Sequence, residues 1–270
     1  MLLRAGSLIL CALGSTNSAV AAVLVTGPSF TYSQDFNTLA TPASNPTTAA
    51  WFNDATLPGW SLFTSASAAP PTYRAEIGNQ DTGSFTAYGS LSASDKALGA
   101  VGYSGAYFGS PAVGAAAGYI AVEFTNASGT TLDSFTLGYS GEQWRWGSTT
   151  SQSMTMQYGF GSTFAGVSGW TTLGSSFGWT SPLTAGSPQG GVDGNGIGKV
   201  TGRGGTQPLL WNVGDTLWLR WTVTNTANTN QGMGIDDVSF AVTAVPEPAS
   251  AFLLIAGLVG LTAARGRITR

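Results

Sequence analysis

The sequence contains no histidine and a single cysteine, Cys11, among its 270 residues. The absence of histidine excludes the Ser-His-Asp and Cys-His arrangements of many hydrolases. Because Cys11 lies in an N-terminal apolar stretch that we expect to be removed, the mature chain also lacks the ligands of the usual zinc sites. Oxygen ligands and paired carboxylates are the remaining routes to metal binding or catalysis. An exported domain without disulfides depends on its hydrophobic core for stability.

Charged residues are also scarce, at 9% of the sequence, against about 25% in ordinary soluble domains. The region 22–244 holds twelve acidic residues and six basic ones, which are Arg74, Lys96, Arg145, Lys199, Arg203 and Arg220. A net negative region without a clustered basic surface excludes nucleic acid as an expected partner. Acidic polysaccharide would be repelled at long range, so we expect a glycan partner to be neutral or bridged by cations.

The N-terminus has the pattern of a secretory signal peptide. Arg4 precedes an apolar stretch at 8–13, and Ala19-Val20-Ala21 offers an A-x-A cleavage site. The residues before Cys11 lack the small side chain that precedes a lipidated cysteine, so lipidation is not expected. We therefore predict that residues 1–21 form a signal helix that directs export through the inner membrane.

The C-terminus has three parts: Val245-Pro246-Glu247-Pro248, an apolar run from Ala249 to Ala264, and the terminal arginines Arg265, Arg267 and Arg270. As a helix the sixteen-residue run spans about 24 Å, less than the hydrocarbon core of about 30 Å. The arginines would hold one end in the cytoplasm, and the two prolines leave an extended, accessible strip at the other. Residues 245–270 thus predict a short transmembrane helix beside a processing site; an ordinary C-terminal anchor is the alternative.

This tripartite tail resembles the PEP-CTERM sorting signal of Gram-negative bacterial surface proteins. Pro246, Glu247, Pro248 and the terminal arginines carry the resemblance. It implies that an exosortase-type membrane protease recognises the tail and removes it. The expected location is therefore the inner membrane before processing, with transient anchoring by the C-terminal helix, and the cell surface or extracellular matrix afterwards.

Between the two hydrophobic ends the sequence predicts one all-β domain over residues 22–244. Apolar residues recur with period 2, which is typical of strands with one buried face. The predicted faces are Ile120, Val122 and Phe124; Phe135, Leu137 and Tyr139; Met154, Met156, Tyr158 and Phe160; Leu217, Leu219, Trp221 and Val223; and Val238, Phe240 and Val242. Such strands, separated by Gly, Ser and Asn clusters, suit two antiparallel sheets packed face to face, a sandwich of jelly-roll type.

Two glycine-containing segments predict turns. The segment 126–131 carries Gly129 and lies between two predicted strands, so we expect those strands to form a hairpin. Asp193-Gly194-Asn195-Gly196 is similar to the start of a calcium loop, but it lacks the bidentate Glu at EF-hand spacing. A turn is the interpretation that we favour there.

Three segments extend the resemblance into the domain. Gly141-Glu142-Gln143-Trp144-Arg145, Trp218-Leu219-Arg220-Trp221 and the segment 234–240 (GIDDVSF) look like an ectodomain that recurs before PEP-CTERM tails. The last segment also resembles the closing strand of MAM and other concanavalin-like jelly rolls. The resemblance implies a domain that binds or assembles rather than catalyses, an argument by analogy.

Asp236 is the candidate metal ligand. Alternation places it on the face of Val238, Phe240 and Val242, where an unpaired carboxylate would be costly. Structural calcium would satisfy it, held by Asp236, by carbonyl groups and by Asp35 from a candidate first strand at 34–37, since first and last strands are commonly neighbours in jelly rolls. The alternative is a carboxylate bonded to loop amides or to an arginine.

The tryptophans divide between a core and a possible ligand surface. Trp218 and Trp221 cannot both face inward on one regular strand, so we assign Trp218 to the opposite face. Together with Glu142 and the run Trp144-Arg145-Trp146, it predicts a sugar-stacking surface. The prediction of a sugar-stacking surface requires the tryptophan rings to cluster on an exposed face. The alternative is that they pack beneath loops.

Glycoside hydrolysis by two carboxylates is the remaining hypothesis for an enzymatic activity. Glu142, flanked by tryptophans, is the best acid candidate, and a partner such as Glu123 or Asp133 would have to lie about 5–9.5 Å away across a groove. The simpler role of Glu142 is a salt bridge or a backbone contact. We predict a non-catalytic surface or matrix protein that associates with exopolysaccharide; a polysaccharide-degrading enzyme and a calcium-stabilised scaffold without a glycan ligand are the alternatives.

Overall fold

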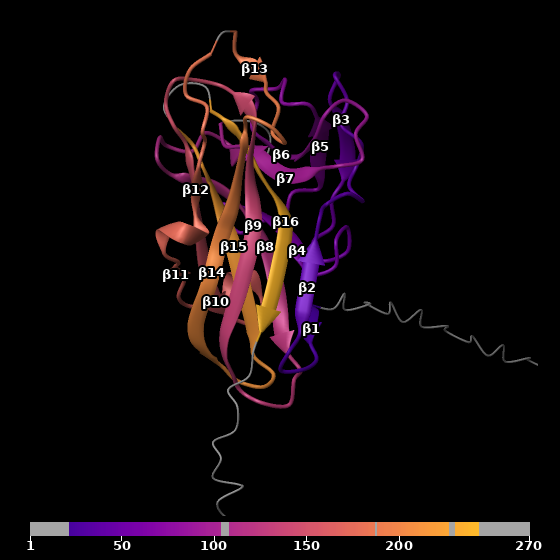
Figure 1. Cartoon of the computed structure of the whole chain (residues 1–270). Helices are drawn as coiled ribbons and strands as arrows, with labels where there is room; N and C mark the ends of the chain where they lie inside the picture. The colour runs from indigo at the N-terminus through magenta and orange to yellow at the C-terminus, as the bar shows by residue number, and fades with distance from the viewer. Residues whose placement is uncertain (1–21, 104–107, 187, 227–229, 243–270) are drawn as a thin grey trace, which may run out of the picture.

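The computed structural model describes residues 22–103, 108–186, 188–226 and 230–242, and these residues form a sandwich of two β-sheets (Figure 1). The signal peptide predicted at 1–21 and the tail predicted at 245–270 lie outside the described residues. Within the described ranges, no helix is long and apolar enough to span a membrane. Two short 3-10 helices accompany the strands, η1 (Phe164–Gly166) and η2 (Ser175–Phe177).

One sheet has seven strands in the order β1-β8-β15-β10-β11, with β4 paired to β8 and β12 paired to β10. We call it the seven-stranded sheet. Its members are β1 (Val23–Val25), β4 (Trp60–Thr64), β8 (Ala116–Asn126), β10 (Ser153–Phe160), β11 (Thr171–Thr172), β12 (Trp179–Thr180) and β15 (Thr216–Thr224).

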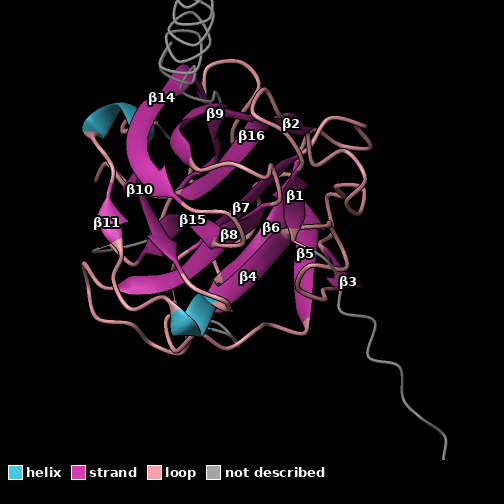
Figure 2. Ribbon diagram, turned by 90° about the horizontal axis from the view of Figure 1, so that it is seen from below, coloured by secondary structure: helices cyan, strands magenta, loops and turns pink. Residues whose placement is uncertain are grey.

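The other sheet has nine strands in the order β13-β9-β16-β7-β6-β5-β3, with β14 paired to β9 and β2 paired to β16. We call it the nine-stranded sheet. Its members are β2 (Thr31–Gln34), β3 (Thr47–Ala50), β5 (Thr72–Glu76), β6 (Ser84–Tyr88), β7 (Ala97–Val101), β9 (Leu132–Trp146), β13 (Gly190–Gly191), β14 (Lys199–Trp211) and β16 (Gly232–Val242). Figure 2, along the long axis, places β14, β9, β16 and β2 in one layer and β10, β15, β8 and β4 in the other.

Both sheets are mixed, which corrects the prediction of wholly antiparallel sheets. β1 pairs in parallel with β8, and β5 pairs in parallel with β6, while the other pairs of described strands are antiparallel. The alternation of side chains has a period of two residues in either strand direction. It therefore identifies a strand without determining how that strand pairs.

The predicted inward faces are confirmed for the long strands. The predicted residues of β8, β9, β15 and β16 are all buried in one common core, whereas Tyr158 and Phe160 of β10 are only partly buried at its edge. The predicted hairpin around Gly129 is wrong, because β8 belongs to the seven-stranded sheet and β9 to the nine-stranded sheet. The segment 127–131 thus carries the chain from one sheet to the other. Alternating apolar residues occur equally in strands that pair side by side and in strands that face each other across a core.

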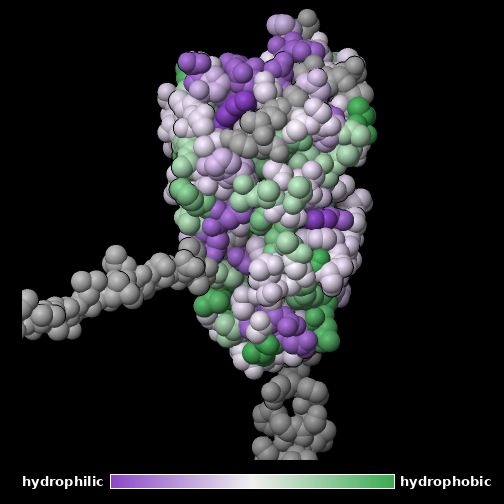
Figure 3. Space-filling view, turned by 180° about the vertical axis from the view of Figure 1, so that it is seen from behind, coloured by the Kyte–Doolittle hydropathy of each residue, from purple (hydrophilic) through white to green (hydrophobic). Residues whose placement is uncertain are grey.

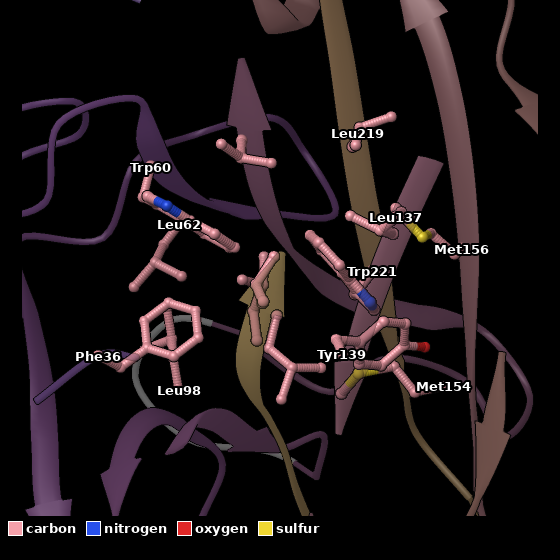
Figure 4. Packing of buried hydrophobic residues seen from close by; sticks show 14 of the residues in the cluster. Phe36, Trp60, Leu62, Leu98, Leu137, Tyr139, Met154, Met156, Leu219 and Trp221 are labelled. Carbon is pink, nitrogen blue, oxygen red and sulfur yellow. The ribbon is translucent and has the colours of Figure 1, made fainter. Parts of the chain in front are cut away.

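Aromatic rings join the two sheets. Phe124 of β8 stacks on Phe240 of β16, with ring centroids 3.9 Å apart. Trp221 of β15 stacks on Trp60 of β4 at 5.7 Å and meets Tyr139 of the facing sheet edge to face at 5.5 Å. Figure 4 shows Trp60, Tyr139 and Trp221 among leucine and methionine side chains contributed by both sheets. Burial of these side chains is the main source of stability in a domain without disulfides.

Candidate functional site

A bulge in β16 changes the position expected for Asp236. The pairing of β16 with β9 shifts register between Asp236 and Ser239, and Asp237 has a φ of 52°. An extra residue in one strand switches the face on which the preceding side chains lie. Asp236, paired with Ser140, therefore points away from the core, while Val238 remains in it. The prediction that Asp236 shares the face of Val238 is wrong, although Asp236 is buried.

The outer face of the nine-stranded sheet holds a second buried carboxylate, Glu142 of β9. The exposed fractions of Glu142 and Asp236 are 0% and 1%. Lys199 Nζ lies 3.1 Å from Glu142 Oε1 and 3.1 Å from Asp237 Oδ2, and Trp144 Nε1 donates a hydrogen bond to Glu142 Oε2 at 2.9 Å. Asp236 Oδ1 has no hydrogen-bond partner among the described residues. Two buried carboxyl groups thus lie on one face with one lysine, which contacts Glu142.

The surroundings of Glu142 and Asp236 act differently on the pKa values of the two carboxyl groups. Burial, and next the charge of Glu142, raises the pKa of Asp236 from 3.8 to about 8, against a hydrogen bond from the backbone of Asp237. Burial also raises the pKa of Glu142, but Lys199 and Trp144 favour its charged form. Like charges in a site of low dielectric cannot both form cheaply. The contacts with Lys199 and Trp144 thus favour the charged form of Glu142, whereas burial and that charge favour the protonated form of Asp236.

The 193–198 loop covers this face. Gly194 lies on the Trp144 ring so closely that an added Cβ would fall 2.3 Å from it. Asp193 Oδ1 accepts hydrogen bonds from two backbone N–H groups of the loop at 3.1 Å each, which confirms the predicted turn. Asn195 Nδ2 donates to Asp95 Oδ2 at 2.8 Å. With the loop in this position, a polymer cannot reach the buried carboxyl groups.

Asp35 and Asp236, the residues expected to hold calcium, lie after β2 and within β16. The first strand, β1, pairs with β8 rather than with the last strand, and the strand that pairs with β16 is β2, which ends one residue before Asp35. The predicted first strand at 34–37 is therefore wrong for all but Gln34. Asp35 lines a surface depression together with Asp237, and it is not among the acidic neighbours that shift the pKa of Asp236. Within the described ranges, no group of three or more His, Cys, Asp or Glu residues could hold a metal ion. The bulge places Asp236 on the outer face of the nine-stranded sheet.

The carboxylate pairs considered for glycoside hydrolysis are not assembled. Glu123 lies on β8 between two core residues, so it points outward from the opposite side of the sandwich to Glu142. Burial and the charge of Asp54 raise its pKa to about 7. Asp133 lies nine residues before Glu142 on the same strand, a separation of about 30 Å. Neither pair meets the spacing of about 5–9.5 Å that two-carboxylate hydrolysis requires.

Trp218 lies on the outer face of the seven-stranded sheet, as predicted, but it is buried there. The segment around η1 covers it, and Trp218 Nε1 donates to the carbonyl of Gly161 at 3.0 Å. Arg220 of the same strand lies between the rings of Tyr119 and Trp170, at 4.1 and 3.8 Å from their centroids. These cation–π contacts hold the segment on the sheet.

Trp144 and Arg145 are buried as well. Arg145 is 4% exposed, and its Nη1 donates to the carbonyls of Gly78 at 3.2 Å and Asn79 at 3.0 Å. Trp144 lies beneath the 193–198 loop. The expected exposed platform of Trp144, Trp146 and Trp218 is therefore absent. A tryptophan that sequence assigns to an outer face is still buried when a loop crosses that face.

Trp146 is only 9% exposed, but it borders open space, as Trp179 does at another pocket. It ends β9 and borders a cavity of about 670 Å³, which we call the polar cavity. The remaining wall contains the side chains of Tyr103 and Val113 and six polar residues, Asp81, Ser148, Thr149, Gln189, Asn225 and Thr226. The indole N–H of Trp146 has no hydrogen-bond partner among the described residues. A volume of this size and a mixed aromatic and polar lining are typical of small-molecule sites.

Buried amides support the floor of the polar cavity. Gln231 Oε1 accepts from the backbone N–H of Gly147 at 2.8 Å, and its Nε2 donates to the carbonyls of Ser148 and Thr150 at 2.8 and 2.9 Å. Gln143 Nε2 donates to the same Gln231 oxygen at 2.9 Å. The loop that carries Ser148 and Thr149 is thus fixed from below, which preorganises the cavity wall.

Sequence reasoning selected Trp146 but missed the other residues of the polar cavity. Tyr103, Asn225 and Gln189 lie in separate segments outside the strands, and no motif or spacing links them. They become neighbours only because β7, β9, β15 and β16 begin or end at the same end of the sandwich. An exposed aromatic residue beside a strand end, as at Tyr103, is the one available signal.

No family model and no curated protein matches the chain. Among solved structures, the chain is similar to the crystal structure of the Agl-KA catalytic domain, with a TM-score of 0.27 and 11% sequence identity over 84% of this chain. The match covers 29% of the Agl-KA chain, so this protein spans less than a third of that structure's length. At this level of similarity, neither a family nor an activity is assigned to the chain.

Proposed function

We propose that the protein is an exported, non-catalytic surface or matrix protein whose jelly-roll-type domain binds neutral exopolysaccharide. The observation that carries this proposal is the polar cavity bordered by Trp146. Aromatic rings beside amide and hydroxyl groups suit sugars, which present both C–H faces and hydroxyl groups. Asp81 is the one charged residue of the described lining, so the lining favours a neutral ligand over an acidic one.

The position of the polar cavity fits a protein anchored by its C-terminus. β16 runs from Gly232, beside Arg145 near the cavity, to Val242, the last described residue. Its eleven residues span about 35 Å. The polar cavity therefore lies toward the start of β16 and Val242 lies at its other end; Figure 1 shows β16 running along the long axis of the sandwich. A chain held in the inner membrane by its tail would present the cavity away from the bilayer.

Surface composition also supports binding at this end. Of the eight large hydrophobic side chains that are exposed in the described ranges, Tyr103 and Val113 border the polar cavity, with exposed fractions of 47% and 68%. The face in Figure 3 shows hydrophilic residues at the upper end of the sandwich and in smaller patches across its middle and lower parts. Exposed apolar side chains within a polar rim are typical of ligand-contact surfaces.

We expect the purified full chain to be retained by neutral polysaccharides and to release no new reducing ends. Tyr103→Ala should weaken retention about tenfold by removing an exposed ring from the cavity wall, the loss that about 1.4 kcal/mol of contact energy produces. Retention on cellulose, chitin and dextran is measured with and without calcium, and the products are analysed for cleavage.

Leu210→Ala is the control, because Leu210 is 70% exposed and does not border the polar cavity. Equal retention of the Tyr103→Ala variant and the unchanged protein would contradict binding at the cavity. Release of reducing ends would instead support the enzyme. Absence of retention on every polysaccharide, with a melting temperature that rises on addition of calcium, would support the scaffold without a glycan ligand.

Sorting through the tail is tested separately. In a Gram-negative host with an exosortase-type protease, we expect the mature chain to lose the residues after the Pro246-Glu247-Pro248 motif. Replacing the motif with three alanines should leave the full-length, membrane-bound form, because the protease then lacks its recognition site. Intact mass and membrane fractionation measure the outcome, and an unprocessed tail in the unchanged protein would support an ordinary anchor.

A further inference from the structure

A second cavity adjoins the polar cavity. It measures about 440 Å³ and shares Trp146 and Gln189 with the polar cavity. We call it the apolar cavity, because its other side chains are Leu183, Ala185, Pro188, Val192 and Ile197, accompanied by glycine backbone. Each cavity alone lies in the range of about 300–1,000 Å³ that small-molecule sites occupy. One tryptophan thus borders two spaces of different chemistry.

The wall of the apolar cavity is built closely against Trp146. An added Cβ at Gly186 would meet the indole ring at 3.3–3.6 Å, so this glycine allows the chain to lie on the ring. The backbone of Leu183 is tied to the Gln143 side chain: its N–H donates to Oε1 at 2.8 Å and its carbonyl accepts from Nε2 at 3.1 Å. Gln143 also bonds Gln231 under the polar cavity, so one buried amide network holds both walls.

We propose that the two cavities are contiguous subsites for a neutral saccharide chain, in which the apolar cavity accepts a unit carrying an acetyl group. This inference rests on the proposed function. The polar cavity offers hydroxyl, amide and carboxylate partners for unsubstituted hydroxyl groups. The apolar cavity offers side-chain carbon, and a methyl group gains free energy from burial there whereas hydroxyl groups lose hydrogen bonds with water.

Ile197 marks the outer edge of the apolar cavity. It is 69% exposed, so the folded domain gains little from its side chain. A surface isoleucine next to an apolar cavity adds contact area for an apolar substituent. Its counterpart is Tyr103, which borders only the polar cavity.

The test compares two oligosaccharide series that share a β-1,4 linkage and neutrality but differ in the acetamido group: cello-oligosaccharides and chito-oligosaccharides of one to six units. Calorimetric titration of the full chain measures both. We expect affinity to rise from one unit to several, and chito-oligosaccharides to bind at least about fourfold more tightly than cello-oligosaccharides of equal length. Fourfold corresponds to about 0.8 kcal/mol, the gain from burying one methyl group.

Substitutions at two exposed residues test the two subsites independently. Ile197→Ser should reduce the preference for the acetylated series while leaving cello-oligosaccharide affinity unchanged, and Tyr103→Ala should weaken both series. Equal affinity for the two series, or an unchanged preference in Ile197→Ser, would overturn the two-subsite inference. If Tyr103→Ala still weakens polysaccharide retention, the proposed function survives that result. Absence of binding by either series and by every polysaccharide would overturn both.

Discussion

Asp236→Asn is expected to raise the melting temperature by several degrees at about pH 9 and to change it little at about pH 4. Asp236 is 1% exposed and lies beside the charged Glu142. Removing a buried charge whose Oδ1 atom has no hydrogen-bond partner among the described residues should stabilise the fold by about 1–3 kcal/mol. Asparagine keeps the size of the side chain and carries no charge.

The pH dependence follows from the direction of the pKa shift. The pKa of Asp236 is raised from 3.8 to about 8 by burial and by the charge of Glu142. Between these values the folded state keeps a proton that the unfolded state has lost, so this residue contributes a stability that falls as pH rises through that window. Above about pH 8 both states are ionised and the fall ends. Thermal unfolding from about pH 4 to pH 10 should therefore show a flatter profile for Asp236→Asn than for the unchanged protein.

Asp237→Asn is the matched control. Asp237 neighbours Asp236 and contacts the same lysine, but its side chain is 57% exposed. Asparagine also accepts the positive φ at this position. The control should change stability by less than about 0.5 kcal/mol at either pH. A loss of stability in Asp236→Asn, together with stabilisation of the unchanged protein by calcium, would show that the buried carboxylate serves a cation.

Trp221→Ala is expected to destabilise the domain by about 3–5 kcal/mol. Trp221 is 0% exposed and contacts Trp60 in its own sheet and Tyr139 in the facing sheet. Its removal would leave a cavity between the two layers, where the surrounding strands cannot collapse. Urea unfolding should show a lower midpoint with an unchanged slope, which indicates a loss of stability without a change in the surface exposed on unfolding.

Two further variants show how much of the stability lost in Trp221→Ala comes from packing in the core. Trp221→Phe keeps a ring in the core and removes an indole N–H that has no hydrogen-bond partner among the described residues, so we expect a loss of about 1–2 kcal/mol. Phe52→Ala removes a ring that is 66% exposed, and we expect a change within about 0.5 kcal/mol. A cost below about 1 kcal/mol for Trp221→Ala would mean that this ring does not hold the two sheets together.

The strands were predictable because their pattern is local. Leu217, Leu219, Trp221 and Val223 alternate along one segment, and all four lie in the core. The pairing of strands was less accessible, since it depends on residues distant in sequence. Alternation around Gly129 was compatible with a hairpin or with a crossing between sheets. The pairing of β8 and β9 in different sheets, which pack together through contacts such as Phe124 on Phe240, decides for the crossing.

At the candidate site, too, local sequence patterns were predictable and contacts between distant residues were not. Trp146 was predicted to contact a ligand because it lies in the run Trp144-Arg145-Trp146. Tyr103 was not predicted, because no nearby residue in the sequence connects it to Trp146. The burial of Trp144 and Trp218 results from Gly194 and the η1 segment, which lie across outer faces. A pattern of period two describes the two faces of a strand, but it contains no information about loops that cover one of them.

The sequence by itself determined the β character of this protein, the scarcity of charge and the absence of histidine chemistry, because each depends on residue type or on neighbours one and two positions away. Only the tertiary structure decided which strands share a sheet, that a bulge at Asp237 turns Asp236 outward beside Glu142, and that Trp146 borders two cavities. These features arise from contacts between segments far apart in the chain. Their energies depend on burial and packing, which exist only once the two sheets have met.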